Sequence, residues 1–258
     1  MLALYHSPYS TCSQKVRLCL AEKGLDYEKR DVDLARQEHL TEAYLALNPN
    51  GVVPTLVHDD AVVIDSSVIC EYLDEVFPET PLSPASAAGR ADMRAWMRYS
   101  EEVPTTAIRP PSFNKIFAKR LANLPDMTLN ELADRMPLRK GFYRRMRGED
   151  GFDDETMRDS LERLGGTLDR MERRLEAGPW LMGDRFTIAD IVVIPTIIRM
   201  VDLSMEDMWA TRPRVADWLA RVEARPSFAE AYYPGTRIDP GAWPAPGAGT
   251  AATEAAQA

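Results

Sequence analysis

A turn rich in hydroxyl groups, Ser7–Ser13, lies between a short apolar segment and a helical pattern close to the start of the chain. The apolar segment Leu2–His6 suits a buried strand. The segment Val16–Lys23 has apolar residues at helical spacing, and Gly24 ends it. Backbone N–H groups at a helix start are unpaired, and the helix dipole makes that end electropositive. The sequence therefore predicts a strand-to-helix turn that stabilises a thiolate or another anion without a metal.

The hydroxyl groups of this turn also have a purely structural interpretation. Ser10, Thr11 and Ser13 are residue types favoured at helix N-caps. This stretch by itself does not distinguish the two interpretations, and the downstream sequence is needed to decide between them.

Length and charge exclude several classes of function. The chain has 258 residues, enough for one large domain or two modest ones, and a net charge of -9. That acidic balance argues against a nucleic-acid partner, because phosphate binding needs concentrated Lys and Arg. No apolar run approaches a membrane span, and no leader-like segment opens the chain. Three cysteines and three scattered histidines indicate neither a disulfide framework nor a metal site, so we expect a cytoplasmic protein.

The first eighty residues alternate strand-like and helix-like patterns in the order strand, helix, strand, helix, strand, strand, helix. Pro54 cannot donate a backbone hydrogen bond, which suits a sheet edge or a cis turn. The segments after the first helix are a strand at 27–32, a helix at 38–47, strands at 52–57 and 62–64, and a helix at 68–77. The pattern predicts a compact α/β domain at 1–77.

The remainder of the chain is predicted to be all-helical. A proline-rich linker occupies 78–85 and a helical domain 86–234, with a long insertion at 104–152 and a mobile tail at 235–258. We expect the helix at 89–102 to end near Pro104, and Pro110 and Pro111 to prevent it from resuming. The predicted helices are 89–102, 113–124, 129–136, 139–147, 153–175, 187–200 and 213–224.

The N-terminal motifs resemble one family. Val53-Pro54 before a strand and Asp65-Ser66 at the next helix start resemble the glutathione-binding domain of glutathione S-transferases. Residues 36–49 resemble the theta class, and the turn at 11–17 resembles the zeta class. The resemblance implies an α/β fold with an N-terminal thioredoxin-like domain and an all-α C-terminal helical domain. It also implies glutathione as co-substrate and a homodimer.

The resemblance assigns a catalytic role to one hydroxyl. In serine-type classes the residue six positions before the Val of the first helix hydrogen-bonds the glutathione sulfur, and counting back from Val16 gives Ser10. A hydroxyl donor at a helix start favours the thiolate over a thiol whose free pKa is about 8.5. Three alternatives stay open: Ser7, because Ser7-Pro8-Tyr9-Ser10 resembles the glutaredoxin Cys-Pro-Tyr-Cys motif, and also Ser13 and a redox-active Cys12.

The remaining glutathione contacts also follow from the resemblance. Val53 with Pro54 pairs with the cysteinyl backbone, and Asp65 with Ser66 binds the γ-glutamyl end. His39 matches the theta-class residue near the glycine carboxylate, with a solvated helix residue as the alternative. Val52 lines the same site where theta members often have Lys, so one carboxylate contact is missing.

The second substrate is expected to bind in an aromatic pocket. Its predicted lining is Tyr9, Trp96, Tyr99, Phe113 and Tyr143. The length of 104–152 and its stretch from Phe142 to Phe152 resemble, more weakly, the bacterial glutathione-dependent β-etherases, which cleave aryl ethers. We therefore expect Lys140, Arg144 or Arg145 near a negative part of the substrate, a solvated basic helix face being the alternative.

The predicted function is a glutathione transferase that directs the thiolate at a small hydrophobic, aromatic electrophile. Thr11-Cys12-Ser13 suggests a zeta-like cis–trans isomerase as one alternative. A non-catalytic glutathione-binding or assembly module is the other. The dimer is predicted to pair acidic residues of one protomer with basic residues of its partner: Glu71, Asp74 and Glu75 with Arg90, Arg94 and Arg98.

Overall fold

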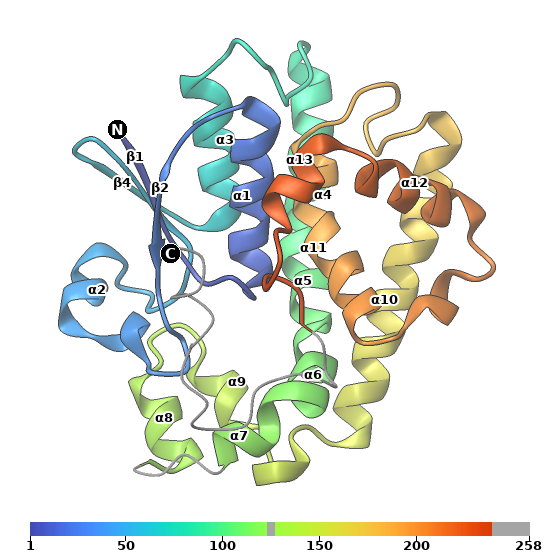
Figure 1. Ribbon diagram of the computed structural model, residues 1–258. Helices are drawn as coiled ribbons and strands as arrows, with labels where there is room; N and C mark the ends of the chain where they lie inside the picture. Colours follow the sequence, from blue (N-terminus) through green and yellow to red (C-terminus); the bar gives the residue numbers. More distant parts are fainter. Residues whose placement is uncertain (123–126, 239–258) are drawn as a thin grey trace.

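The computed structural model describes residues 1–122 and 127–238, shown in Figure 1. A four-stranded sheet has the order β2-β1-β3-β4. Its strands are β1 (Leu2–His6), β2 (Glu28–Asp31), β3 (Thr55–His58) and β4 (Ala61–Ile64). β1 runs parallel to β2 and antiparallel to β3, with Leu4 opposite Leu56 at the fully buried centre. This is the predicted thioredoxin-like arrangement, and it is confirmed.

Helices cover both faces of the sheet. In Figure 1, α1 (Thr11–Lys23) and α3 (Ser66–Val76) lie together on one face, and α2 (Glu42–Leu47) lies on the other. The helix predicted at 38–47 is divided into a 3₁₀ turn, Glu38–Leu40, and α2. Thr41 causes the break, because its backbone is extended and its hydroxyl accepts the N–H of Tyr44 to cap a new helix.

The C-terminal domain is built around one buried helix. α11 (Ile188–Asp202) packs against α1 and α4 (Ala87–Glu102), so it joins the two domains. Thr187 and Asp190 form the predicted capping box at its start. The other elements of this domain are α10 (Asp154–Arg174), α12 (Pro213–Glu223), α13 (Pro226–Ala231) and the 3₁₀ turns Leu175–Ala177 and Glu206–Trp209.

α4 ends just before Pro104, as predicted, but the expectation that the prolines keep the following chain out of helix is wrong. The chain continues as α5 (Pro104–Ala107), α6 (Arg109–Ser112), a π-helical turn Phe113–Phe117 and α7 (Ala118–Ala122). Prolines lie in the first positions of α5 and α6. The missing proline N–H would be unpaired there anyway, so a new helical turn begins at each one. The C-terminal end of the helix predicted at 113–124 lies outside the described residues.

The insertion folds as a small unit with its own apolar cluster. α8 (Leu129–Arg135) and α9 (Lys140–Arg144) pack together, and a 3₁₀ turn follows at Gly148–Asp150. Asn114 closes the unit, since its side chain accepts the Phe152 N–H at 2.7 Å and donates to the Phe152 carbonyl at 2.9 Å. Gly151 permits this approach, because its φ is +68° and a Cβ there would meet Asn114. The cluster's buried members from the insertion are Ala118, Leu132, Ala133, Met136, Tyr143, Met146 and Phe152, and Leu40 of the thioredoxin-like domain joins them.

The first residues of the predicted mobile tail pack onto the domain. Ile238 is buried, Arg237 pairs with Asp202 at 2.7 Å, and the Thr236 carbonyl accepts the Gln14 side chain at 3.0 Å. The tail prediction is therefore wrong for 235–238, and for 239–258 it lies outside the described residues. Within residues 1–122 and 127–238, none of the helices has the length and apolar character that a membrane span requires.

Candidate active site

Ser10 caps the start of α1. Its backbone is extended, with φ -71° and ψ 120°, and its Oγ accepts the Ser13 N–H at 3.3 Å. The side chain is partly exposed. A hydroxyl that accepts through one lone pair still has its O–H to donate. Ser10 thus combines a capping role with a free donor at the electropositive end of α1.

The alternative hydroxyl groups are placed differently. Ser13 is fully buried, and its Oγ accepts the Ser7 N–H at 3.3 Å. Ser7 is 5% exposed. These two serines hold the turn together from inside. Cys12, by contrast, is partly exposed beside Ser10 and stays an open alternative.

Two buried arginines hold the carbonyl groups of the turn. Arg17 on α1 donates to the Pro8 carbonyl at 3.0 Å and to the Ala231 carbonyl at 3.0 Å. Arg199 on α11 donates to the Tyr9 carbonyl at 2.6 Å. With its carbonyl oxygens turned toward these cations, the turn is left with its N–H groups at the start of α1 for a ligand.

The loop before β3 is locked in place by side chains of α2 and its end. The Val53–Pro54 peptide bond is cis, as the sequence suggests. The Val52 carbonyl accepts the Tyr44 hydroxyl and the Asn48 amide, both at 2.8 Å. Val53 is buried and Val52 is partly exposed. Side chains of the same domain therefore fix the backbone conformation of this loop.

Asp65 caps α3 next to that loop. Its carboxylate accepts the N–H groups of Ser67 at 2.9 Å and Val68 at 3.2 Å, while Ser66 is 4% exposed. The side chain of Asp65 remains largely exposed. A free carboxylate oxygen beside a helix start suits a ligand group carrying both an ammonium and a carboxylate.

A charged network behind α1 was missed by sequence reasoning. The buried Lys15 ammonium pairs with Glu101 at the end of α4, and Glu101 also accepts the Ser67 hydroxyl at 2.6 Å. Burial acts to lower the pKa of Lys15, but the Glu101 carboxylate outweighs it and the pKa is raised. The network joins α1, α3 and α4. The one signal for this network in the sequence is a lysine, Lys15, among the residues of α1 that are buried.

His39 is not the solvated residue of the alternative interpretation. It is 6% exposed, and its Nδ1 has no hydrogen-bond partner among the described residues. Burial, followed by the charges of Arg139 and Arg135, lowers the pKa of His39 to about 4. The ring is therefore neutral at pH 7 and lies where the thioredoxin-like domain meets the insertion.

The predicted aromatic pocket is not assembled as expected. Phe113 and Tyr143 lie together with ring centroids 5.8 Å apart. Trp96 and Tyr99 instead pack between α4 and α10, where the Tyr99 hydroxyl contacts Thr167 at 3.0 Å and the Arg170 guanidinium covers both rings. Placing these two residues in the pocket is wrong, because the face of α4 that carries them is turned to α10. Tyr9 stays beside Ser10 and is partly exposed.

The basic residues expected near the substrate lie on the surface of α9. Lys140 and Arg144 both pair with Asp134, at 2.6 Å and 2.7 Å. The Arg145 guanidinium lies over the Phe152 ring at 6.0 Å. The interpretation of these residues as an exposed helix face is the one that the contacts favour.

Some of the residues expected to form charge pairs between protomers instead form pairs within their own chain. Asp74 is buried and pairs with Lys23 at 2.9 Å. Arg94 pairs with Glu71 of its own chain. The proposed role of Asp74 at a dimer contact is therefore wrong.

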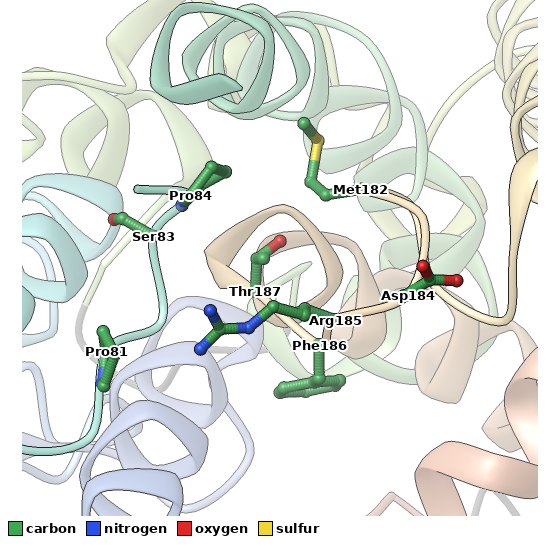
Figure 2. A pocket seen from close by; sticks show the side chains of 8 residues that line it. All are labelled: Pro81, Ser83, Pro84, Met182, Asp184, Arg185, Phe186 and Thr187. Atoms are coloured by element: carbon green, nitrogen blue, oxygen red, sulfur yellow. The ribbon is translucent and has the colours of Figure 1, made fainter. Parts of the chain in front are cut away.

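A surface hollow of about 240 Å³ lies away from these residues (Figure 2). Its lining comes from the linker, Pro81 to Pro84, and from the loop before α11, Met182 to Thr187. Figure 2 shows Arg185 reaching across it toward the linker. None of the predicted site residues lines it, so it does not represent the active site.

Sequence models of one family match both halves of the chain. "Glutathione S-transferase, N-terminal domain" matches residues 4–81, and "Glutathione S-transferase, C-terminal domain" matches residues 154–221. Maleylacetoacetate isomerase from Pseudomonas aeruginosa is 30% identical over 236 residues, which cover 90% of this chain and 95% of the isomerase. The chain belongs to the glutathione S-transferase family. The family predicted from the Ser10 turn, Val53-Pro54 and Asp65-Ser66 is confirmed.

Two other relatives of this transferase bear on its function. Glutathione S-transferase 1 from Dianthus caryophyllus is 33% identical over 203 residues, covering 78% of this chain and 77% of that protein. The protein LigF from Sphingobium sp. SYK-6 is 29% identical over 245 residues, covering 92% and 95%. The crystal structure of this β-etherase superposes with a TM-score of 0.80, covering 90% of this chain and 98% of LigF.

Proposed function

We propose that this transferase holds the glutathione thiolate at Ser10 and directs it at a small, hydrophobic, aromatic electrophile. The observation that carries the proposal is the placement of the serines. Ser10 presents a partly exposed donor at the start of α1, whereas Ser7 and Ser13 are buried and Ser13 accepts the Ser7 N–H. A hydroxyl donor and the helix dipole together favour the thiolate form of glutathione.

The other residues of the site hold the tripeptide. Val53, before the cis-Pro54, pairs with the cysteinyl backbone, and the partly exposed Val52 packs beside it. Asp65 receives the γ-glutamyl ammonium, and the start of α3 at Ser66 receives the α-carboxylate. His39, neutral at pH 7, donates one hydrogen bond toward the glycine end. These contacts leave the sulfur as the part of glutathione that Ser10 addresses.

Aryl ether cleavage is the reaction that the comparisons favour within this class. LigF, named a β-etherase, aligns with this chain over nearly its whole length. In such a cleavage the thiolate attacks the carbon that carries the ether oxygen. The C–S bond forms, the C–O bond breaks, and the phenolate leaves with the bonding electron pair and takes a proton from water. Ser10 contributes by raising the fraction of glutathione that is present as the thiolate, the form that attacks.

A zeta-like isomerase is the second candidate. It is favoured by the Thr11-Cys12-Ser13 turn and by the 30% identity to maleylacetoacetate isomerase. In an isomerisation the thiolate adds to a cis-enone, rotation follows, and the same thiolate leaves. A non-catalytic glutathione-binding module would bind glutathione without shifting the titration of its thiol.

The proposal is tested by assaying glutathione with an aryl ether, a benzyl halide and a cis-enone. Ser10→Ala should reduce turnover of the accepted substrate at least about tenfold, because each unit by which the pKa of the glutathione thiol rises lowers the thiolate fraction at neutral pH about tenfold. Glutathione affinity should stay within about tenfold, because Ser10 addresses only the sulfur. Cys12→Ala is the matched control and should be nearly silent. Activity of Ser10→Ala within twofold of the parent protein would remove Ser10 from the mechanism, and a large loss in Cys12→Ala would favour redox chemistry.

We also propose that the protein is a cytoplasmic homodimer. α3 and the edge strand β4 carry exposed apolar side chains, Val62, Val68 and Val76, which suit a symmetric contact between copies. Sedimentation at micromolar concentration should give the mass of a dimer, and a monomer there would contradict this part of the proposal.

A further inference from the structure

Two arginines inside the insertion lack the partners that buried charges need. Arg109 and Arg139 are both partly buried, and Nε of Arg139 is fully buried without a hydrogen-bond partner. Among the described residues, neither guanidinium lies within ion-pairing distance of a carboxylate. The neighbouring carboxylates are engaged elsewhere: Glu101 binds Lys15 and Ser67, and Asp134 binds Lys140.

The helix geometry brings these two arginines to the same place. Arg109 precedes Phe113 by about one helical turn, and Arg139 precedes Tyr143 by the same interval, with the Tyr143 N–H donating to the Arg139 carbonyl at 3.2 Å. The rings of Phe113 and Tyr143 are in contact. The charges of both arginines act on the pKa of the buried Tyr143 hydroxyl, and the charge of Arg139 acts on Arg109, so the two guanidiniums lie near this ring and near each other.

The surroundings of Arg109 connect this pair to the active site. Burial lowers the pKa of Arg109, the Arg139 charge lowers it further, and Cys12 and Glu101 raise it. Arg139 acts in turn on the pKa of His39. The two arginines therefore lie between the start of α1, where the sulfur of glutathione is proposed to bind, and the histidine proposed for its glycine end.

Two adjacent guanidiniums without counter-charges are costly unless an anion joins them. A charge withdrawn from water is destabilising unless it is paired, and a planar carboxylate accepts paired hydrogen bonds from a guanidinium. We propose that Arg109 and Arg139 together form a carboxylate-binding subsite of this transferase. The carboxylate comes either from the glycyl end of glutathione or from the electrophile, so the inference rests on the proposed function.

The subsite is tested by calorimetric binding of four compounds to the full-length protein. The compounds are glutathione, its glycyl monoethyl ester, S-benzylglutathione and S-(4-carboxybenzyl)glutathione. Arg109→Met and Arg139→Met should each weaken binding of a carboxylate-bearing compound at least tenfold. Loss for glutathione but not for its ester assigns the glycyl carboxylate. Loss for the carboxybenzyl conjugate beyond that for the benzyl conjugate assigns a carboxylate on the electrophile.

Matched variants separate binding from structure. Arg144→Met, on the same helix but paired at the surface, should bind all four compounds like the parent protein. Because Arg109 and Arg139 are unpaired in the free protein, Arg109→Met and Arg139→Met should melt at or above the parent's temperature. Unchanged affinities for all four compounds, or a clear drop in melting temperature without ligand, would overturn the subsite. If the parent protein bound none of the four, the proposed function itself would fail, and Ser10→Ala, which is expected to bind normally, tests the thiolate chemistry separately.

Discussion

The turn before α1 and the insertion at 104–152 are both rich in polar residues, but their polar groups are used in different ways. In the turn, residues close in the sequence satisfy one another's hydrogen-bonding groups. The Ser10 hydroxyl accepts the Ser13 N–H, and the Ser13 hydroxyl accepts the Ser7 N–H. In the insertion, the charges pair according to how its helices pack. Lys140 and Arg144 share Asp134, while Arg109 and Arg139 are left over. Local sequence thus determines a capping motif, whereas the unpaired charges of a site emerge only from tertiary packing.

The junction between the two regions offers the largest expected effect on stability. Glu101→Gln removes the carboxylate that neutralises the buried Lys15. Breaking a buried pair in this way costs about 3 kcal/mol, the low end of the usual range, because Glu101 is partly exposed to water. Urea unfolding measures the loss. The double variant Lys15→Met/Glu101→Gln should recover part of it, and a single variant as stable as the parent protein would show that Lys15 does not depend on Glu101.

Removing one ring tests whether the insertion is a separate packing unit. Phe113 contacts Phe117, Phe142, Tyr143 and Phe152. Because Phe113 is only partly buried, Phe113→Ala should cost about 2 kcal/mol. Hydrogen exchange should increase within the insertion while β1 and β3 stay protected. The control is Phe228→Ala, which removes a partly buried ring from the main core. Equal loss of protection in the sheet and the insertion would contradict two separate units.

The smallest expected effect is a pH dependence where the two regions meet. The pKa of His39 is lowered to about 4, so the fold favours the neutral ring and the unfolded chain binds the extra proton below pH 6.5. Stability from His39 is therefore complete above pH 6.5 and is lost as the pH falls toward 4.

Lowering the pH from 7.5 to 5.5 should remove about 1 kcal/mol of this contribution. The same change in pH should cost the His39→Gln variant about 1 kcal/mol less than it costs the parent protein, because the variant has no imidazole to protonate. Urea unfolding of both proteins at both pH values measures the difference. Parallel losses in the two proteins would show that His39 titrates normally.

The thioredoxin-like half was predictable from the sequence because its signals are local. The Asp65 cap, the cis Val53–Pro54 bond and the Ser10 cap are each signalled by residues close together in the sequence, and each is found in the structure. The strand order followed from the family resemblance.

The helical half was less predictable, for two physical reasons. A proline at the start of a short helix looks like a helix breaker in the sequence, so the continuation through Pro104, Pro110 and Pro111 was missed. Periodicity also shows that a helix is amphipathic without showing which neighbour it meets. Trp96 and Tyr99 were therefore placed in the pocket, although they pack against α10.

The hydrogen bond from Arg199 to the Tyr9 carbonyl has a consequence for exchanging domains between relatives. The conformation of the Ser10 turn is completed by a residue nearly two hundred positions away, on a helix of the other domain. A chimaera that joins this thioredoxin-like domain to another helical domain would keep its strands, its cis-proline and its own caps. The Tyr9 carbonyl in its turn would have no guanidinium donor unless the new domain carried an arginine at the position of its buried helix that matches Arg199. We therefore expect a chimaera to keep the conformation of the Ser10 turn only if its helical domain supplies a donor to the Tyr9 carbonyl.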